Sequence, residues 1–158
     1  MAFCSRKATR LRNYDYSKDN YYFITICTHD KQCIFGTTEE LSLLGKIASR
    51  DMEKISKHYE GVYVDNYVIM PNHIHAIIVL QNSEGTQKRH TLGEIIGQYK
   101  SGVSRQIRKM KPDAIVWQRS FHDHIIRNRK AYEQIWSYVE HNALKWETDC
   151  FYPGVKEF

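Results

Sequence analysis

The sequence predicts an α+β fold in which helices pack on one face of an antiparallel sheet. Three observations predict it. Short segments rich in β-branched and aromatic residues are typical of strands, longer segments repeat apolar residues every three or four positions, and the two kinds of segment alternate along the chain. A chain of 158 residues is long enough to bury one core, so we expect a single domain over residues 1–158.

The first half of the chain predicts a strand, a helix and a hairpin. Residues 21–28 (YYFITICT) have the composition of a buried strand. Residues 39–59 are expected to form an amphipathic helix, because their apolar residues recur at helical spacing. Residues 62–70 and 73–80 are two further strands, and the Pro-Asn pair between them is typical of a turn, so we expect them to pair as a hairpin.

The second half predicts two helices separated by extended chain. Thr91 and Glu94 can form a capping box that begins a helix, and this helix ends where a Lys-Pro pair follows it at position 111. Residues 115–126 hold one or two extended pieces, and residues 129–141 form the last helix. The order strand, helix, strand, strand, helix, strand, helix predicts a ferredoxin-like sheet, which is also the arrangement of RNA-recognition domains.

The composition argues against a membrane protein. The longest apolar run, residues 76–80, is far shorter than the roughly 20 residues that a membrane helix needs. The first residues (MAFCSRKATRLR) lack the apolar centre of a secretory signal. We therefore expect a cytoplasmic protein with no membrane partner.

Positive charge is concentrated in two blocks of the chain. The net charge is +5; residues 1–18, a basic N-terminal arm, hold five Lys or Arg against one Asp, and residues 97–130 hold nine against two. Aromatic residues accompany both blocks, which favours a polyanion with stackable bases, although a solvated basic face is the alternative. The residues predicted to contact nucleic-acid phosphates are Arg6, Lys7, Arg10 and Arg12 in the arm, with Arg105, Arg108 and Lys109 in the second helix.

Two histidines begin the third predicted strand, in the stretch MPNHIHAIIVL. Side chains two apart on a strand point to the same face, so His73 and His75 project together and can bind one divalent ion. They need a further protein ligand, because a pair alone does not complete a metal site. His122 and His124, in the stretch FHDHII, form a second pair with weaker strand character and are the rival candidates.

The last predicted helix supplies a candidate nucleophile and a third ligand. Tyr138 and Asn142 are four residues apart and lie on one face of this helix. If the helix crosses the sheet near the histidines, Asn142 offers its amide oxygen to the ion. The phenol of Tyr138, whose ordinary pKa is about 10, then attacks a phosphodiester that the ion polarises. Tyr99 is the rival nucleophile, but the residue four positions later is a valine, which offers no ligand.

The chain resembles the IS200/IS605-like single-tyrosine transposases of the HUH superfamily, and within them the REP-associated tyrosine transposases. Four stretches carry the resemblance: RLRNYDYSKDNYYFITICTHDKQCIFG, YVIMPNHIHAIIVL, VWQRSFHDHIIRN and YVEHNALKW. One departure is visible, because the REP-associated pattern commonly reads Asn-Pro where this chain has Asn142-Ala143.

The resemblance implies an HUH endonuclease fold and a metal-dependent endonuclease and strand transferase that acts on single-stranded DNA near hairpins. It implies that His73, His75 and Asn142 hold Mg²⁺ or Mn²⁺ and that Tyr138 forms a 5′-phosphotyrosine intermediate. Relatives act as homodimers or as monomers, and the resemblance leaves both open.

Two other functions remain open at this point. A non-catalytic single-stranded nucleic-acid-binding module can share the RNA-recognition fold, although the aromatic motif expected in its strands is absent from this sequence. A metal-dependent phosphodiesterase can use water in place of tyrosine as the nucleophile. Trapping of a covalent phosphotyrosine separates both from the transposase-like function.

Overall fold

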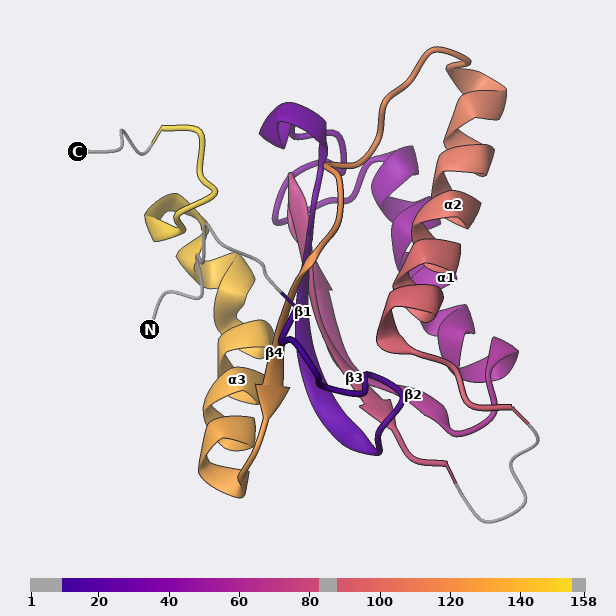
Figure 1. Ribbon diagram of the computed structural model, residues 1–158. Coiled ribbons are helices and arrows are strands. Elements are labelled where there is room, and N and C mark those ends of the chain that lie inside the picture. The colour runs from indigo at the N-terminus through magenta and orange to yellow at the C-terminus, as the bar shows by residue number, and fades with distance from the viewer. Residues whose placement is uncertain (1–9, 83–87, 155–158) are drawn as a thin grey trace.

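Four antiparallel strands form the centre of the protein, and helices cover both faces of the sheet (Figure 1). The structure is a computed structural model that describes residues 10–82 and 88–154. The strands are β1 (Asn20–Cys27), β2 (Val62–Ile69), β3 (His73–Leu80) and β4 (His122–Ile126), and their order across the sheet is β2-β3-β1-β4. All neighbouring pairs are antiparallel, as expected for a ferredoxin-like fold, so the predicted fold class is confirmed.

The two central strands are buried on both sides. One face of β1 and β3, which includes Ile24 and Ile74, packs against the helices α1 (Leu43–His58) and α2 (Leu92–Met110). The other face, which includes Phe23 and Ile77, packs against α3 (Arg129–His141). The sequence pattern predicted all helices on one face; this prediction is wrong, because α3 lies on the face opposite α1 and α2 (Figure 1). The first core is larger, but the second core is the one that holds α3 near the histidines of β3.

Side-chain caps determine where the helices begin. The predicted capping box of α2 is present: Glu94 N–H donates to Thr91 Oγ1 at 3.2 Å, and the Glu94 carboxylate accepts from Thr91 N–H at 3.2 Å. In α3, Ala131 N–H donates to the Asn128 amide oxygen at 2.8 Å. Ser42 caps α1 in the same way, which explains why that helix begins at residue 43 and not at the predicted residue 39. Each such cap contributes about 1 kcal/mol.

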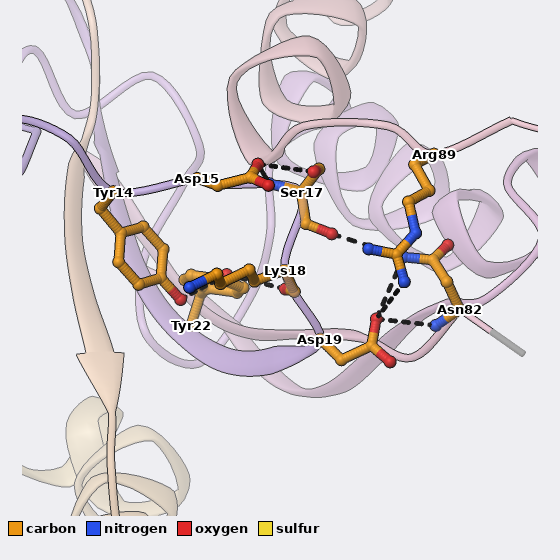
Figure 2. Close-up of polar contacts among 8 residues, drawn as sticks. All are labelled: Tyr14, Asp15, Ser17, Lys18, Asp19, Tyr22, Asn82 and Arg89. Carbon is orange, nitrogen blue, oxygen red and sulfur yellow. Dashed lines mark hydrogen bonds and ion pairs between the residues drawn. The ribbon is translucent and has the colours of Figure 1, made fainter.

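The chain before β1 is tied to the loop that follows β3 (Figure 2). Asp19 Oδ1 accepts hydrogen bonds from the backbone N–H and the side-chain amide of Asn82, at 3.1 and 3.2 Å, and lies 3.7 Å from the Arg89 guanidinium. Tyr22 donates its hydroxyl to the Lys18 carbonyl at 2.9 Å. These contacts close the end of the sheet that lies away from the histidines.

Within the described residues, no helix combines the length and the apolar composition that crossing a bilayer requires.

Candidate active site

Strand pairing fixes the positions of His73 and His75. In β3, His73 lies opposite Cys27 and His75 lies opposite Thr25 of β1. The alternation of a strand turns both imidazoles toward the α3 face, while Ile74 between them packs into the opposite core. Both histidines are 0% exposed, and their ring centroids are 4.6 Å apart. The sequence prediction that these side chains lie together is therefore correct.

A neighbouring oxygen orients each imidazole through its Nδ1 atom. His73 Nδ1 lies 2.8 Å from the Asn72 amide oxygen, which can only accept, so Nδ1 carries the proton and Nε2 has a lone pair. His75 Nδ1 lies 2.8 Å from the Thr25 hydroxyl, which can accept in the same way. Both Nε2 atoms are buried and have no hydrogen-bond partner within the described residues. Metal-binding histidines are held by their second nitrogen in this manner.

Burial keeps the two imidazoles neutral. Loss of solvation lowers the pKa of His75 to about 3, and it lowers the pKa of His73 well below its usual range. The neighbouring His75 lowers the pKa of His73 further, whereas contact with Asn142 opposes the decrease. A metal ion binds the neutral form of imidazole, so both side chains are ready as ligands at neutral pH.

The end of α3 brings a third lone pair into this region. Asn142 follows the last residue of α3 and is only 2% exposed. Its Nδ2 atom lies 3.4 Å from Asp149 Oδ2, while its Oδ1 atom has no partner in the described part of the chain. Three buried acceptor atoms are thus left unsatisfied in one region: His73 Nε2, His75 Nε2 and Asn142 Oδ1. Buried polar atoms normally have a partner, so this group of acceptor atoms is suited to bind a cation.

Tyr138 lies one helical turn before Asn142 and contacts the histidines. Its ring centroid is 5.3 Å from that of His75 and 6.1 Å from that of Phe23. Burial, and then the nearby Asp149 carboxylate, raise the pKa of Tyr138 to about 12, and contact with Asn142 opposes the increase. The phenol is therefore protonated at neutral pH. Tyr138 also lines a groove along α3 together with Lys130, Glu133, Gln134, Ser137, His141 and Lys145.

Asp149 is the site residue that the sequence analysis missed. It follows a 3₁₀ segment, Asn142–Thr148, that turns the chain back toward the sheet. One carboxylate oxygen of Asp149 and one nitrogen of each histidine all lie within 4.8 Å of one another. The only sequence signal was an acidic residue between two aromatic residues, Trp146 and Phe151, and such a pattern is too common to identify a ligand.

The rival candidates do not form a comparable group. Tyr99 is buried in the opposite core, where its hydroxyl donates to the Ala48 carbonyl at 2.8 Å. His122 lies across Thr25 from His75, and its Nδ1 atom is buried without a partner in residues 10–82 and 88–154. Neither His122 nor His124 belongs to the described group of three potential metal ligands, so the prediction that they are the weaker pair is in line with the geometry.

The basic residues predicted to contact DNA are dispersed. Arg6 and Lys7 lie outside the described residues. Arg10 forms an ion pair with Asp123 at 2.8 Å and stacks on Phe121, whereas Arg12 is exposed. The remaining three lie on α2, and the sheet separates them from Tyr138 on α3. Arg105 and Lys109 line a groove between α1 and α2. Arg108 donates a hydrogen bond to the Ala114 carbonyl. Phosphate contacts by these residues stay a prediction. The three residues on α2 could contact only a part of the DNA that lies away from Tyr138.

The sequence model of the IS200-like transposases matches residues 16–142. The chain belongs to this family. A Haemophilus influenzae protein shares 36% identity with this IS200-like transposase over an alignment 167 positions long, which covers 93% of each chain. A solved REP-associated tyrosine transposase bound to a REP hairpin has 22% identity and a TM-score of 0.60, covering 87% of this chain and 73% of the other. A candidate transposase from Deinococcus radiodurans has 14% identity and a TM-score of 0.53, covering 84% and 96%.

The family match and the geometry coincide over most of the site. The matched range includes both histidines, Tyr138 and Asn142, and it ends before Asp149. Family membership gives this IS200-like transposase a transposase-like function, and the grouped His and Asp side chains are suited to a divalent metal ion. The two solved structures support the fold.

Proposed function

We propose that this IS200-like transposase cleaves and rejoins single-stranded DNA through a covalent bond to Tyr138, with a divalent ion held by His73, His75 and Asn142. The observation that carries the proposal is the group of three unsatisfied, buried acceptor atoms beside Tyr138. The amide oxygen suits Mg²⁺ or Mn²⁺, and the two imidazole nitrogens can bind a first-row divalent ion; a bound ion would stabilise the negative charge on the phosphate and the leaving oxygen.

Tyr138 forms a covalent bond to phosphorus when the DNA is cleaved, and this bond breaks when the DNA is rejoined. Its phenolic oxygen attacks the phosphorus of a DNA phosphodiester and loses its proton to solvent in the groove. The P–O3′ bond breaks, and the leaving 3′ oxygen gains a proton. The product is a 5′-phosphotyrosine and a free 3′-OH. In the reverse direction a 3′-OH attacks the phosphotyrosine and releases Tyr138, so the bond energy is kept for joining.

Cations beside the nucleophile lower the cost of this chemistry. Because burial raises the pKa of Tyr138 to about 12, the phenolate needs neighbouring positive charge. Lys130 and Lys145 line the groove along α3 that also contains Tyr138. We propose that the strand to be cut lies in this groove, with its phosphates near the two lysines.

The substrate we propose is single-stranded DNA next to a hairpin. The similar solved transposase is bound to a REP hairpin, which supports the same class of DNA for this chain. Contact between Tyr138 and His75 of one chain supports a site completed within a single copy. A homodimer stays a prediction from the sequence.

Covalent trapping tests the proposal. The protein is incubated with labelled single-stranded DNA from the flanks of its own gene and Mn²⁺, and the products are separated on a denaturing gel. We expect a protein–DNA adduct that is lost in Tyr138→Phe and in samples with EDTA. The matched control is Tyr132→Phe, which removes a hydroxyl from the same helix and should keep the adduct. Binding without cleavage would support the non-catalytic module, and cleavage without an adduct would support a water nucleophile.

A further inference from the structure

We infer that the Asp149 carboxylate is a fourth protein ligand of the ion in this site. The inference rests on the proposed function, because it needs the ion that the histidines and Asn142 are proposed to hold. It concerns a residue beyond the range that the family model matches.

The first support is the distance between the ligand atoms. One oxygen of Asp149 and one nitrogen each of His73 and His75 lie within 4.8 Å of one another. An octahedral ion with ligands at about 2.1 Å places neighbouring ligand atoms about 3 Å apart and opposite ones about 4.2 Å apart. The ligand atoms are at most 4.8 Å apart, so a decrease of no more than about 1.8 Å in any one separation would bring the group into coordination.

The second support is that no cationic side chain in the described part of the chain balances the charge of the Asp149 carboxylate. Asp149 is 7% exposed, yet no ion pair with Lys or Arg is found for it in the part of the chain that the structure describes. Its two hydrogen bonds come from neutral groups, Phe151 N–H at 2.8 Å and Asn142 Nδ2 at 3.4 Å. A buried carboxylate without a cation is costly, and a divalent ion at the adjacent lone pairs would remove this cost.

The third support is the way the chain fixes Asp149 to the histidines. The Phe151 carbonyl accepts from Asn72 Nδ2 at 2.8 Å, and Asn72 Oδ1 orients His73. The Phe151 ring also packs on the His73 ring, with centroids 4.4 Å apart. These contacts form a closed set that links Asp149 through Phe151 and Asn72 to His73. The carboxylate is therefore held in a fixed position beside the histidines.

The chemistry of the ion favours a carboxylate at this position. Two imidazoles and an amide are neutral, and nitrogen-rich sets of this kind also suit softer ions such as Zn²⁺. A carboxylate adds a hard, negatively charged ligand that Mg²⁺ and Mn²⁺ prefer. Four protein ligands leave two positions of a six-coordinate ion open, which is enough for a phosphate oxygen and a water.

The test measures Mn²⁺ binding to the full-length chain by calorimetry, together with thermal unfolding in EDTA. In Asp149→Asn we expect Mn²⁺ affinity to fall by about 10- to 100-fold, the range seen when groups around a metal are removed. The unfolding temperature in EDTA should stay level or rise, because a buried charge has been removed. The matched control is Glu147→Gln, which removes an exposed charge two residues away and should leave the affinity unchanged.

Each outcome decides between the inference and its alternatives. An affinity in Asp149→Asn within twofold of the wild type would overturn the inference and leave the three-ligand site intact. A lower affinity accompanied by a lower unfolding temperature in EDTA would also overturn it, since Asp149 would then act only by holding the turn. If the wild type binds Mn²⁺ but never forms a DNA adduct, the proposed chemistry fails while the Asp149 inference stands. A wild type that binds no Mn²⁺ would overturn both.

Discussion

Acidification should destabilise the metal-free protein through its two buried histidines. In the unfolded chain an imidazole has a pKa of about 6.5. In the folded chain burial lowers the pKa of His75 to about 3, and the pKa of His73 also lies well below its usual range. Below pH 6.5 the unfolded state therefore binds more protons than the folded state. The stability that depends on neutral imidazoles is complete above about pH 6.5 and is lost as the pH falls toward 3.

The magnitude follows from the difference between the folded and unfolded pKa values. At pH 5.5, one unit below the pKa of the unfolded chain, each imidazole that stays neutral in the folded chain lowers the free energy of unfolding by about 1.4 kcal/mol. We therefore expect the pair to reduce the free energy of unfolding by about 3 kcal/mol between pH 7.5 and 5.5. Asp149 acts in the opposite direction, because burial raises its pKa and the folded state takes up this proton first on acidification. The full loss is thus expected in Asp149→Asn.

Urea unfolding at the two pH values, in EDTA, measures this loss. The double variant His73→Gln/His75→Gln should lose most of the pH dependence. The control His58→Gln, at an exposed position at the end of α1, should retain it. Equal free energies of unfolding for Asp149→Asn at pH 7.5 and 5.5 would refute the reasoning. A pH dependence that survives in the double variant would show that other groups cause it.

Two further predictions concern the second nitrogen of His75 and the groove along α3. Thr25→Val keeps the side-chain shape but removes the oxygen 2.8 Å from His75 Nδ1. Mn²⁺ affinity measured by calorimetry should therefore fall about 10- to 100-fold. An unchanged affinity would show that Thr25 does not support metal binding by His75. Replacement of Lys130 and Lys145 by alanine should flatten the dependence of single-stranded DNA affinity on salt by about 1.4 in the log–log slope, whereas Lys57→Ala on α1 should not. Equal slopes for the two variants would exclude the groove as the DNA path.

Local sequence patterns predicted much of the fold and the centre of the site. The alternation of a strand is enough to put His73 and His75 on one face, and the spacing of a helix is enough to put Tyr138 and Asn142 together. The side of the sheet that α3 covers was predicted wrongly. Strands β1 and β3 are nearly continuous apolar runs, which is typical of strands buried on both faces, and this signal favoured helices on both sides.

Two features of the site could not be predicted, because they depend on tertiary contacts. Asp149 reaches the histidines only because a 3₁₀ segment reverses the chain and Phe151 bonds to Asn72. In the sequence nothing distinguishes Arg10 from the other cations of the basic arm, yet in the structure it forms an ion pair with Asp123, more than one hundred residues later. Exposed and partly exposed charges have no periodic pattern in the sequence, so their partners cannot be identified from spacing.

A divalent ion fits the unsatisfied acceptor atoms of the proposed site better than a single water molecule does. A water molecule has two hydrogens and can satisfy two of the three atoms His73 Nε2, His75 Nε2 and Asn142 Oδ1. The Asp149 carboxylate adds a further acceptor, so a single water leaves at least one lone pair unpaired, at a cost of about 1–3 kcal/mol. One divalent ion can accept all of these lone pairs. Because the proposed ion would bind the folded chain and not the unfolded one, saturating Mn²⁺ should raise the unfolding temperature, and this increase should be absent when both histidines are replaced by glutamine.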